Sequence, residues 1–316
     1  MQILRYRRWF FVLSLALIGL GVISMLVPPA FRIGIEFSGG SASSIAFTKS
    51  VSQEDLRQVL ERLGHSEAII QGLGDNAFLI RTRTLAEAQR NEAGQIITPS
   101  EKQTLQEALE TELAPINTFE FSSVSPVIAS ETVRNAIIAV AIASIAILLY
   151  IWWAFRSVPN SFRMGATAII AVVHDVLITL GIFSILGKFL NIEVNAMFIT
   201  GILAVVGYSV NDTIVVFDRI RENTARRVSR EMASTINISI MESLGRSLTT
   251  SITTMTVILA LLLMGGGTIE SLLYTLLIGV IVGTYSSIAI ASQLLMVWEQ
   301  GGWLPFLHKK EAGAEA

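Results

Sequence analysis

The chain has 316 residues, of which 52% are hydrophobic and only 15% are charged, and its formal net charge is -2. Together with a positive mean hydropathy, this composition favours an integral membrane protein over a large soluble enzyme. No cysteine is present, which excludes disulfides, thiolate metal sites and cysteine nucleophiles.

Six apolar runs are long enough to cross a bilayer, which takes about 20 residues of helix. They cover residues 9–27, 136–155, 164–186, 196–217, 247–264 and 271–298. The first run follows Arg7 and Arg8 and resembles a signal peptide, but it is nearly as long as a span and no clear A-x-A site precedes Pro28. We therefore interpret it as an uncleaved first span.

Basic residues concentrate at the N-terminus, in alternate links between spans and at the C-terminus. They are Arg5, Arg7, Arg8, Arg156, Arg163, Arg219, Arg221, Arg226, Arg227, Arg230, Lys309 and Lys310. Because cytoplasmic loops carry the excess of Lys and Arg, we expect both termini to be cytoplasmic. The predicted division is an N-terminal tail with the first span at 1–29, an outer domain at 30–130, spans two to six at 131–300 and a cytoplasmic tail at 301–316.

The polar segment at 30–130 is the one sizeable domain, and this topology places it outside the cytoplasm. Its pattern predicts strand, helix, strand, strand, helix and strand at 41–48, 52–63, 68–72, 77–83, 100–113 and 117–124. Ser52 and Ser100 are the expected N-caps of the two helices. The βαββαβ order predicts a ferredoxin-like α+β domain between the first two of six transmembrane helices. No nucleophile and base motif is present in it, so we expect binding or levering rather than catalysis.

The fourth apolar run carries an acid, Asp212, at a depth where a carboxylate costs about 2.5 to 3.5 kcal/mol on an insertion scale. Gly201, Ala204, Tyr208 and Asp212 recur at helical spacing, so we expect this face to meet partner helices. The opposite face is predicted to be lipid-like, and it consists of Ile199, Leu203, Val206, Val210, Ile214 and Phe217.

The third span holds a second intramembrane acid, Asp175, preceded by His174. Ala168, Ala171 and Thr179 share its small, polar face, so this carboxylate is also predicted to point inward.

Arg246 lies where the fifth span begins, in a helix that is expected to start near Met232 as an amphipathic segment. Asp212 is about 9 Å inside Asp218 along a helix, so Asp212 and Arg246 could meet near the same membrane boundary. An arginine that moves away, or water that enters, would let the carboxylate take a proton, which describes a gated proton site. A fixed ion pair that only holds two helices together is the alternative.

In the sixth span, Gly279 and Gly283 predict close helix contact.

Four motifs carry a resemblance to a known family. They are GIEFSGG at 34–40, VHDV at 173–176, GYSVNDTIVVFDRIREN at 207–223 and RSLTTSITT at 246–254. From the first span to the sixth, the chain resembles SecF proteins, the smaller subunits of the SecD-SecF protein-export motor in the resistance-nodulation-division superfamily. The long motif of the fourth span is the specific one, whereas GIEFSGG reads most simply as a linker.

The resemblance implies a non-enzymatic subunit of a bacterial inner membrane that pairs with SecD, associates with the SecYEG channel and indirectly with SecA, and pulls unfolded preproteins outward with inward proton flow. It implies no cofactor, no metal and no nucleic-acid partner. Asp212 matches the family's proton-linked carboxylate, Arg246 its basic partner, and Asp175 the acid of the third span.

Two other functions remain compatible with these residues. A structural scaffold of the channel complex would need no proton site. A small-molecule or lipid exporter of the same superfamily is the other alternative, although such pumps usually join two six-span halves in one chain.

Overall fold

The computed structural model describes residues 6–74, 76–90, 96–154, 156, 161–264 and 269–299. The predicted cytoplasmic tail at 301–316 lies outside the described residues, as does Arg5. The chain forms two compact units, a helical unit of Met1–Arg32 with Ile138–Ala316 and a sheet unit of Ile33–Ile137. Each unit is described separately below.

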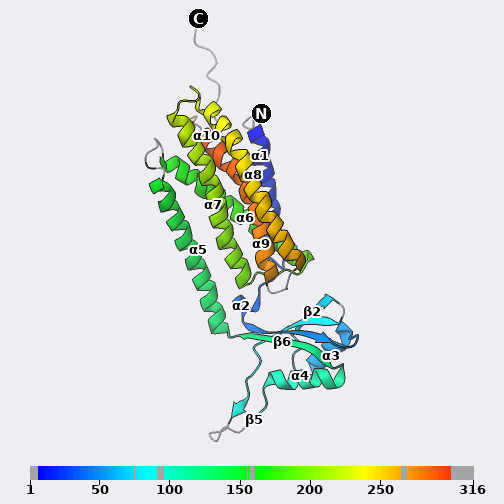
Figure 1. Ribbon diagram of the computed structural model, residues 1–316. Helices are drawn as coiled ribbons and strands as arrows, with labels where there is room; N and C mark the ends of the chain where they lie inside the picture. The colour runs from blue at the N-terminus through cyan, green and yellow to red at the C-terminus, as the bar shows by residue number, and fades with distance from the viewer. Residues whose placement is uncertain are drawn as a thin grey trace. The chain divides into compact units, whose positions relative to one another are not determined.

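Six helices of the described chain are long and apolar enough to span a membrane, as predicted. They are α1 (Arg7–Leu26), α5 (Pro126–Ala154), α6 (Ser161–Phe189), α7 (Ala196–Ala225), α8 (Met232–Met264) and a last span that begins with α9 (Glu270–Ser286) (Figure 1).

Helix α5 begins earlier than the apolar run that predicted it. Pro126 occupies its first position, where the missing N–H group costs nothing, and the hydroxyl of Ser125 accepts from the amide of Ile128 at 3.3 Å. The helix therefore starts at a regular cap, and its polar first turns were not detectable by hydropathy. Residues up to Ile137 of this helix belong to the sheet unit.

The predicted interfacial segment and the fifth span are one continuous helix, α8. The residues that α8 buries in its first half repeat at helical spacing. They are Thr235, Ile236, Ser239, Ile240 and Ser243.

The last span is interrupted by a wider turn. After α9 comes a π-helical turn at Ser287–Ala291, and α10 (Ser292–Glu299) completes the span. The hydroxyl of Ser292 donates to the carbonyl of Ser287 at 2.8 Å, five residues back. Such turns insert one residue into an α-helix and often mark functional sites.

Helix α7 packs against α6, α8 and α9. Its closest partner is α9, and small residues carry the contact, as Gly279 and Gly283 predicted. A Cβ at Gly279 would lie 2.0 Å from Val205 Cγ2, and one at Gly201 would lie 2.7 Å from Thr275 Cβ. The two backbones can approach this closely only because glycine occupies these positions.

The predicted lipid-like face of α7 is wrong. Val206, Val210 and Phe217 are all buried in the core of the helical unit, whereas Ala204, expected to face a partner, is exposed. In a bundle, lipid tails and neighbouring helices are equally apolar. A helix that packs against neighbours on several sides therefore carries apolar residues on all of those sides. Its sequence then does not reveal which side faces lipid.

Helix α1 packs on α6 at another glycine contact. A Cβ at Gly21 would lie 2.7 Å from Gly181 Cα. Nearby, the hydroxyls of Ser24 and Ser184 are 2.8 Å apart.

The sheet unit contains a four-stranded antiparallel sheet in the order β2-β3-β1-β6. The strands are β1 (Gly40–Phe47), β2 (Ile69–Gly74), β3 (Ala77–Thr82) and β6 (Ile116–Val124). Helix α3 (Gln53–Arg62) joins β1 to β2, and α4 (Glu101–Glu112) precedes β6, both on one face of the sheet (Figure 1). Ile45, Phe47, Leu56 and Leu105 belong to the core between the sheet and these helices.

Both predicted N-caps of this unit are confirmed, since Ser52 accepts from the amide of Asp55 and Ser100 from that of Gln103. A short hairpin of β4 (Gln89–Arg90) and β5 (Ile96–Thr98) was not predicted. Before β1, the short helix α2 (Ile35–Ser38) leads into Gly40, which has φ +117°. A Cβ there would lie 2.6 Å from the carbonyl oxygen of Thr82, so glycine is required.

Candidate functional site

Asp212 lies on α7 inside the helical unit, and its side chain is nearly buried, with 7% exposed. Oδ1 accepts a hydrogen bond from the hydroxyl of Ser247 on α8 at 2.6 Å. No donor among the described residues reaches Oδ2 with hydrogen-bond geometry. Oδ1 is therefore hydrogen-bonded to Ser247, whereas Oδ2 is buried without a hydrogen bond among the described residues, and the hydroxyl of Ser287 lies close to the carboxylate.

Arg246 does not hold this carboxylate in the described conformation. It lies on the exposed side of α8, and no ion pair joins it to Asp212 among the residues that the structure describes. Adjacent helical residues point about 100° apart, and here Ser247 is the one that donates to Asp212. Arg246 acts on the carboxylate through its charge, without an ion-pair contact in the described conformation.

The sequence contains a pattern that indicates an inward-facing Ser247, and our prediction of the Asp212 partner did not use it. Serines recur every four residues on α8, at 239, 243, 247 and 251, and all four are buried. A polar stripe at helical spacing on a membrane helix indicates the side that faces other helices.

Asp175 on α6 is 1% exposed and has donors from three helices. Oδ2 accepts from the hydroxyl of Ser209 on α7 at 2.5 Å and from that of Ser286 on α9 at 2.7 Å. His174 Nδ1 lies 2.8 Å from Oδ1. The predicted inward orientation is confirmed, and both carboxylate oxygens have partners.

A pair of adjacent serines connects the surroundings of the two acids. Ser286 donates to Asp175, and the next hydroxyl, that of Ser287, lies 3.0 Å from Thr213 Oγ1, one residue after Asp212. Ser287 also donates to the carbonyl of Gly283 at 2.8 Å.

A further hydroxyl group lies one turn of α8 beyond Ser247. Ser251 Oγ is 3.0 Å from the phenol oxygen of Tyr208 and 2.5 Å from Thr284 Oγ1. We call this set of buried and partly buried acids and hydroxyls the polar belt. It comprises Asp175, Tyr208, Ser209, Asp212, Thr213, Ser247, Ser251, Thr284, Ser286 and Ser287.

The polar belt consists of carboxylates and hydroxyls, which are groups that can accept and donate protons. Within the described ranges, no three His, Asp or Glu side chains gather to hold a metal ion. A carboxylate oxygen without a hydrogen bond can take a proton without first losing one, as Oδ2 of Asp212 could. A proton on Asp175 would displace His174 from Oδ1 or compete with Ser209 and Ser286 at Oδ2.

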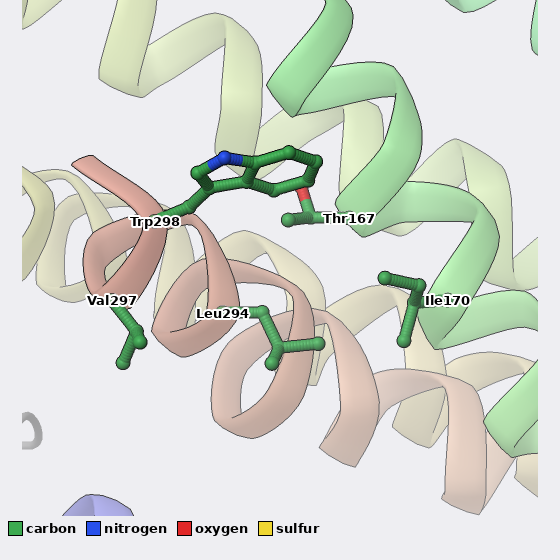
Figure 2. A pocket seen from close by; sticks show the side chains of 5 residues that line it. All are labelled: Thr167, Ile170, Leu294, Val297 and Trp298. Atoms are coloured by element: carbon green, nitrogen blue, oxygen red, sulfur yellow. The ribbon is translucent and has the colours of Figure 1, made fainter. Parts of the chain in front are cut away.

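A small pocket of about 20 Å³ lies between α6 and α10, and neither of these acids lines it. Figure 2 shows its lining, which consists of Thr167, Ile170, Leu294, Val297 and Trp298. The lining is mostly apolar and carries no ionisable side chain, so it offers no group for proton chemistry.

Comparison with known proteins adds a family relationship. Residues 104–301 match the family described as "Protein export membrane protein SecD/SecF, C-terminal". The protein translocase subunit SecF of Thermobaculum terrenum is 42% identical over 316 residues, which are 100% of this chain and 99% of the relative. That of Anaerolinea thermophila is 36% identical over 319 residues and is covered completely.

Two solved structures are similar in fold. SecDF of Thermus thermophilus, described as a translocon-associated membrane protein, superposes with a TM-score of 0.78 at 33% identity. A structure of SecDF in a super-membrane-facing form gives 0.65 at 32% identity. In both cases the match covers 95% of this chain and 39% of the solved chain. The chain thus spans the length of its SecF relatives but less than half of a SecDF chain.

Proposed function

This chain belongs to the SecF family of protein translocase subunits, and on that basis we propose that it is a proton-coupled subunit that pairs with SecD. It is a multi-pass protein of the bacterial inner membrane with a role in Sec protein translocation. The proposal adds that the proton gradient drives late preprotein translocation and that Asp212 carries the proton.

The observation that carries the proposal is the buried Oδ2 of Asp212. A buried ionisable group in a membrane span is a functional site by default, and here Oδ1 accepts from Ser247 while the buried Oδ2 has no hydrogen bond among the described residues. One charge that crosses 100 mV releases about 2.3 kcal/mol. This free energy biases a two-state motion by a factor of about 50.

Arg246 is the proposed counterpart in a second state. It directly precedes Ser247 on α8, so a rotation of that helix by about 100° would exchange the hydroxyl for the guanidinium. The carboxylate would be charged beside Arg246 and free to take a proton beside Ser247. Asp175 is the proposed third member of the relay, because Ser286 and Ser287 connect it to the residue after Asp212.

The proposal extends to the sheet unit and to the partners. We assign the unit a ferredoxin-like topology and an extracytoplasmic position between the first two spans, with both termini cytoplasmic. It would contact unfolded preprotein and transmit motion rather than catalyse a reaction. SecD is the direct partner, SecYEG the associated channel, and SecA an indirect partner.

The test replaces Asp212 in the complex with SecD and SecYEG, reconstituted in vesicles that carry a proton gradient. We expect Asp212→Asn to lower gradient-dependent export by up to about 50-fold, the bias that one charge provides. Asp212→Glu, which keeps a titratable group, should retain part of the activity. Asp218→Asn is the control, because that acid is 55% exposed and pairs with Arg221 on its own helix.

Undiminished export by Asp212→Asn at equal amounts of assembled complex would refute proton coupling at this residue. A loss that merely follows a smaller amount of complex would support the scaffold function instead.

A further inference from the structure

Helices α7 and α8 meet along a seam of polar contacts that continues beyond the polar belt. In each contact a side chain of α7 meets one of α8. The pairs are Tyr208 with Ser251, Asp212 with Ser247, Arg219 with Glu242, and Asn223 with Ser239. Residue numbers rise along α7 as they fall along α8, so one register of two antiparallel helices satisfies all four pairs.

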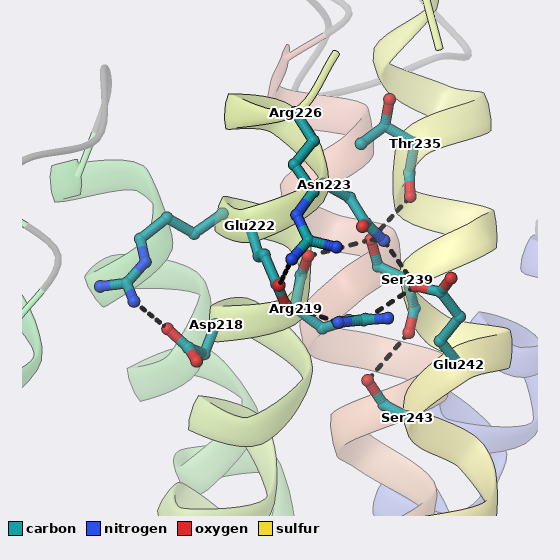
Figure 3. A network of polar contacts seen from close by, with 10 residues as sticks. Asp218, Arg219, Glu222, Asn223, Arg226, Thr235, Ser239, Glu242 and Ser243 are labelled. Atoms are coloured by element: carbon teal, nitrogen blue, oxygen red, sulfur yellow. Dashed lines mark hydrogen bonds and ion pairs between the residues drawn. The ribbon is translucent and has the colours of Figure 1, made fainter. Parts of the chain in front are cut away.

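The last two pairs form a network at the end of the seam (Figure 3). Arg219 Nε donates to Glu242 Oε2 at 2.7 Å, and Asn223 Nδ2 donates to the same oxygen at 2.7 Å. Asn223 Nδ2 also donates to Ser239 Oγ at 3.0 Å. We call Arg219, Asn223, Ser239 and Glu242 the clamp.

The buried amide is the strongest part of the clamp. Arg219 and Glu242 are 35% and 39% exposed, and an exposed ion pair alone contributes little. Asn223 is only 2% exposed. Its removal would take the donor from the buried hydroxyl of Ser239 and one of two donors from Glu242, and the loss at a buried group is the costly one.

The clamp can also open without leaving Arg219 without a carboxylate. Arg219 Nη1 donates to Glu222 on its own helix at 2.5 Å. If α8 carried Glu242 away, Arg219 would keep this carboxylate. Its guanidinium would not be left alone near the membrane boundary.

We propose that the clamp sets the register and rotation of α8 on α7 and so keeps Ser247, rather than Arg246, against Asp212. Arg219, Asn223 and Glu242 are then positioning residues, since none of them touches the proton-carrying carboxylate. The inference rests on the proposed function of Asp212. It adds that the balance between the Ser247 and Arg246 states is controlled at the far end of the seam.

The first measurement reports the helix register and needs no proton transport. Because the chain has no cysteine, spin labels can be placed at Gly207→Cys on α7 and Leu248→Cys on α8, which are both exposed, in the complex with SecD. Asn223→Ala and Glu242→Ala are expected to shift or broaden the distance between the labels. Arg221→Ala is the matched control, because Arg221 pairs with Asp218 within α7, and its distance should not change.

The second measurement reports the hydrogen bond of Asp212 by infrared difference spectroscopy on the same complex. The carboxyl C=O band of protonated Asp212 is identified by its loss in Asp212→Asn, and Ser247→Ala shows where it moves without the hydroxyl. We expect Asn223→Ala to move the band in the same direction and to lower gradient-driven export by about tenfold, as loss of a charge-assisted hydrogen bond predicts. Glu242→Gln keeps an acceptor for Asn223, so its band shift and its loss of export should both be smaller than those of Glu242→Ala.

The outcomes separate the two proposals. An unchanged label distance and an unchanged band in both Asn223→Ala and Glu242→Ala would overturn the clamp. A shifted distance without any band that depends on Asp212 would support the clamp and overturn proton binding at Asp212. If Asn223→Ala does not assemble, Glu242→Ala and Glu242→Gln decide the result.

Discussion

Two buried carboxylates of the helical unit differ in how many donors hold them. Asp175 accepts from Ser209 and Ser286 and contacts His174, whereas the hydrogen bond that reaches Asp212 within the described chain comes from Ser247. A carboxylate with several donors is held more firmly than one with fewer donors, which can exchange partners more easily. We therefore expect replacement of Asp175 to lower stability in addition to its proposed part in the relay, and replacement of Asp212 to affect transport more than stability.

The first prediction concerns Asp175→Ala. This change takes the buried acceptor from Ser209 and the nearer of two acceptors from Ser286, and it also removes the partner of His174. We therefore expect the free energy of unfolding to fall by about 3 kcal/mol. Thermal unfolding of the purified protein in mild detergent measures the effect. Asp218→Ala, which removes an exposed acid of α7, should change the stability by no more than about 0.5 kcal/mol. Equal melting temperatures for the two variants would contradict the assigned role of Asp175.

The site could be predicted from the sequence in part. Asp175 and Asp212 were evident because an acid in an apolar run is costly and has few structural explanations. The contact between Asp212 and Ser247 was not evident, because charge alone favoured Arg246 as the partner. Which of two adjacent residues faces a neighbour depends on the rotation of the helix, and packing along its whole length sets that rotation.

At the scale of elements, the contact between α7 and α9 depends on glycine rather than on interlocking large side chains. Thr275 lies against Gly201, and Val205 lies against Gly279. This close approach brings the α9 serines to the acids, since a polar contact between helices needs backbones that are near each other.

The second prediction compares two glycines of α7. A Cβ at Gly201 would lie 2.7 Å from Thr275 Cβ, whereas nothing lies within 4 Å of a Cβ at Gly207. We expect Gly201→Ala to lower the free energy of unfolding by about 1 to 3 kcal/mol through overpacking. Gly207→Ala should be neutral or should stabilise the helix by up to about 1 kcal/mol. Melting temperatures measured side by side test this, and a loss of stability in Gly207→Ala alone would refute it.

Sequence patterns predicted the helices and their caps more reliably than they predicted which side chains contact neighbouring helices. The six spans and the caps at Ser52 and Ser100 follow from local chemistry, namely apolar length and a side chain that satisfies free amides. The burial of Val206 and Phe217 and the π-helical turn do not, because they arise from contacts between helices far apart in the chain. Hydropathy is the same for a residue against lipid and for one against a neighbouring helix.

At the scale of the whole molecule, the two units demand different surroundings. The helical unit exposes large apolar side chains on its spans, including Leu263 at 89% and Trp9 at 74% exposure, as a membrane protein requires. The sheet unit has its own core of Ile45, Leu56, Leu105 and their neighbours. The exposed apolar side chains suit the helical unit to a lipid environment, and the separate hydrophobic core can stabilise the sheet unit as a domain of its own.

The third prediction tests the proposed orientation of these units. Glu54 in the sheet unit and Ala225, the last residue of α7, are both exposed. The chain has no native cysteine, so Glu54→Cys and Ala225→Cys each provide one thiol. In intact cells whose outer membrane is permeable, a membrane-impermeant maleimide should label Glu54→Cys at once. It should label Ala225→Cys only after the inner membrane is opened. Immediate labelling of Ala225→Cys, with Glu54→Cys labelled only after the inner membrane is opened, would show that the topology is the opposite of the proposed one.

The neighbouring positions of Ser286 and Ser287 have a consequence for the whole helical unit. The hydroxyl of Ser286 donates to Asp175, and that of Ser287 lies 3.0 Å from Thr213 Oγ1. Because these serines are adjacent where α9 meets the π-helical turn, a rotation of the backbone at this point would displace both contacts together. Movement at this junction would therefore alter the surroundings of Asp175 and of the residue next to Asp212 at the same time.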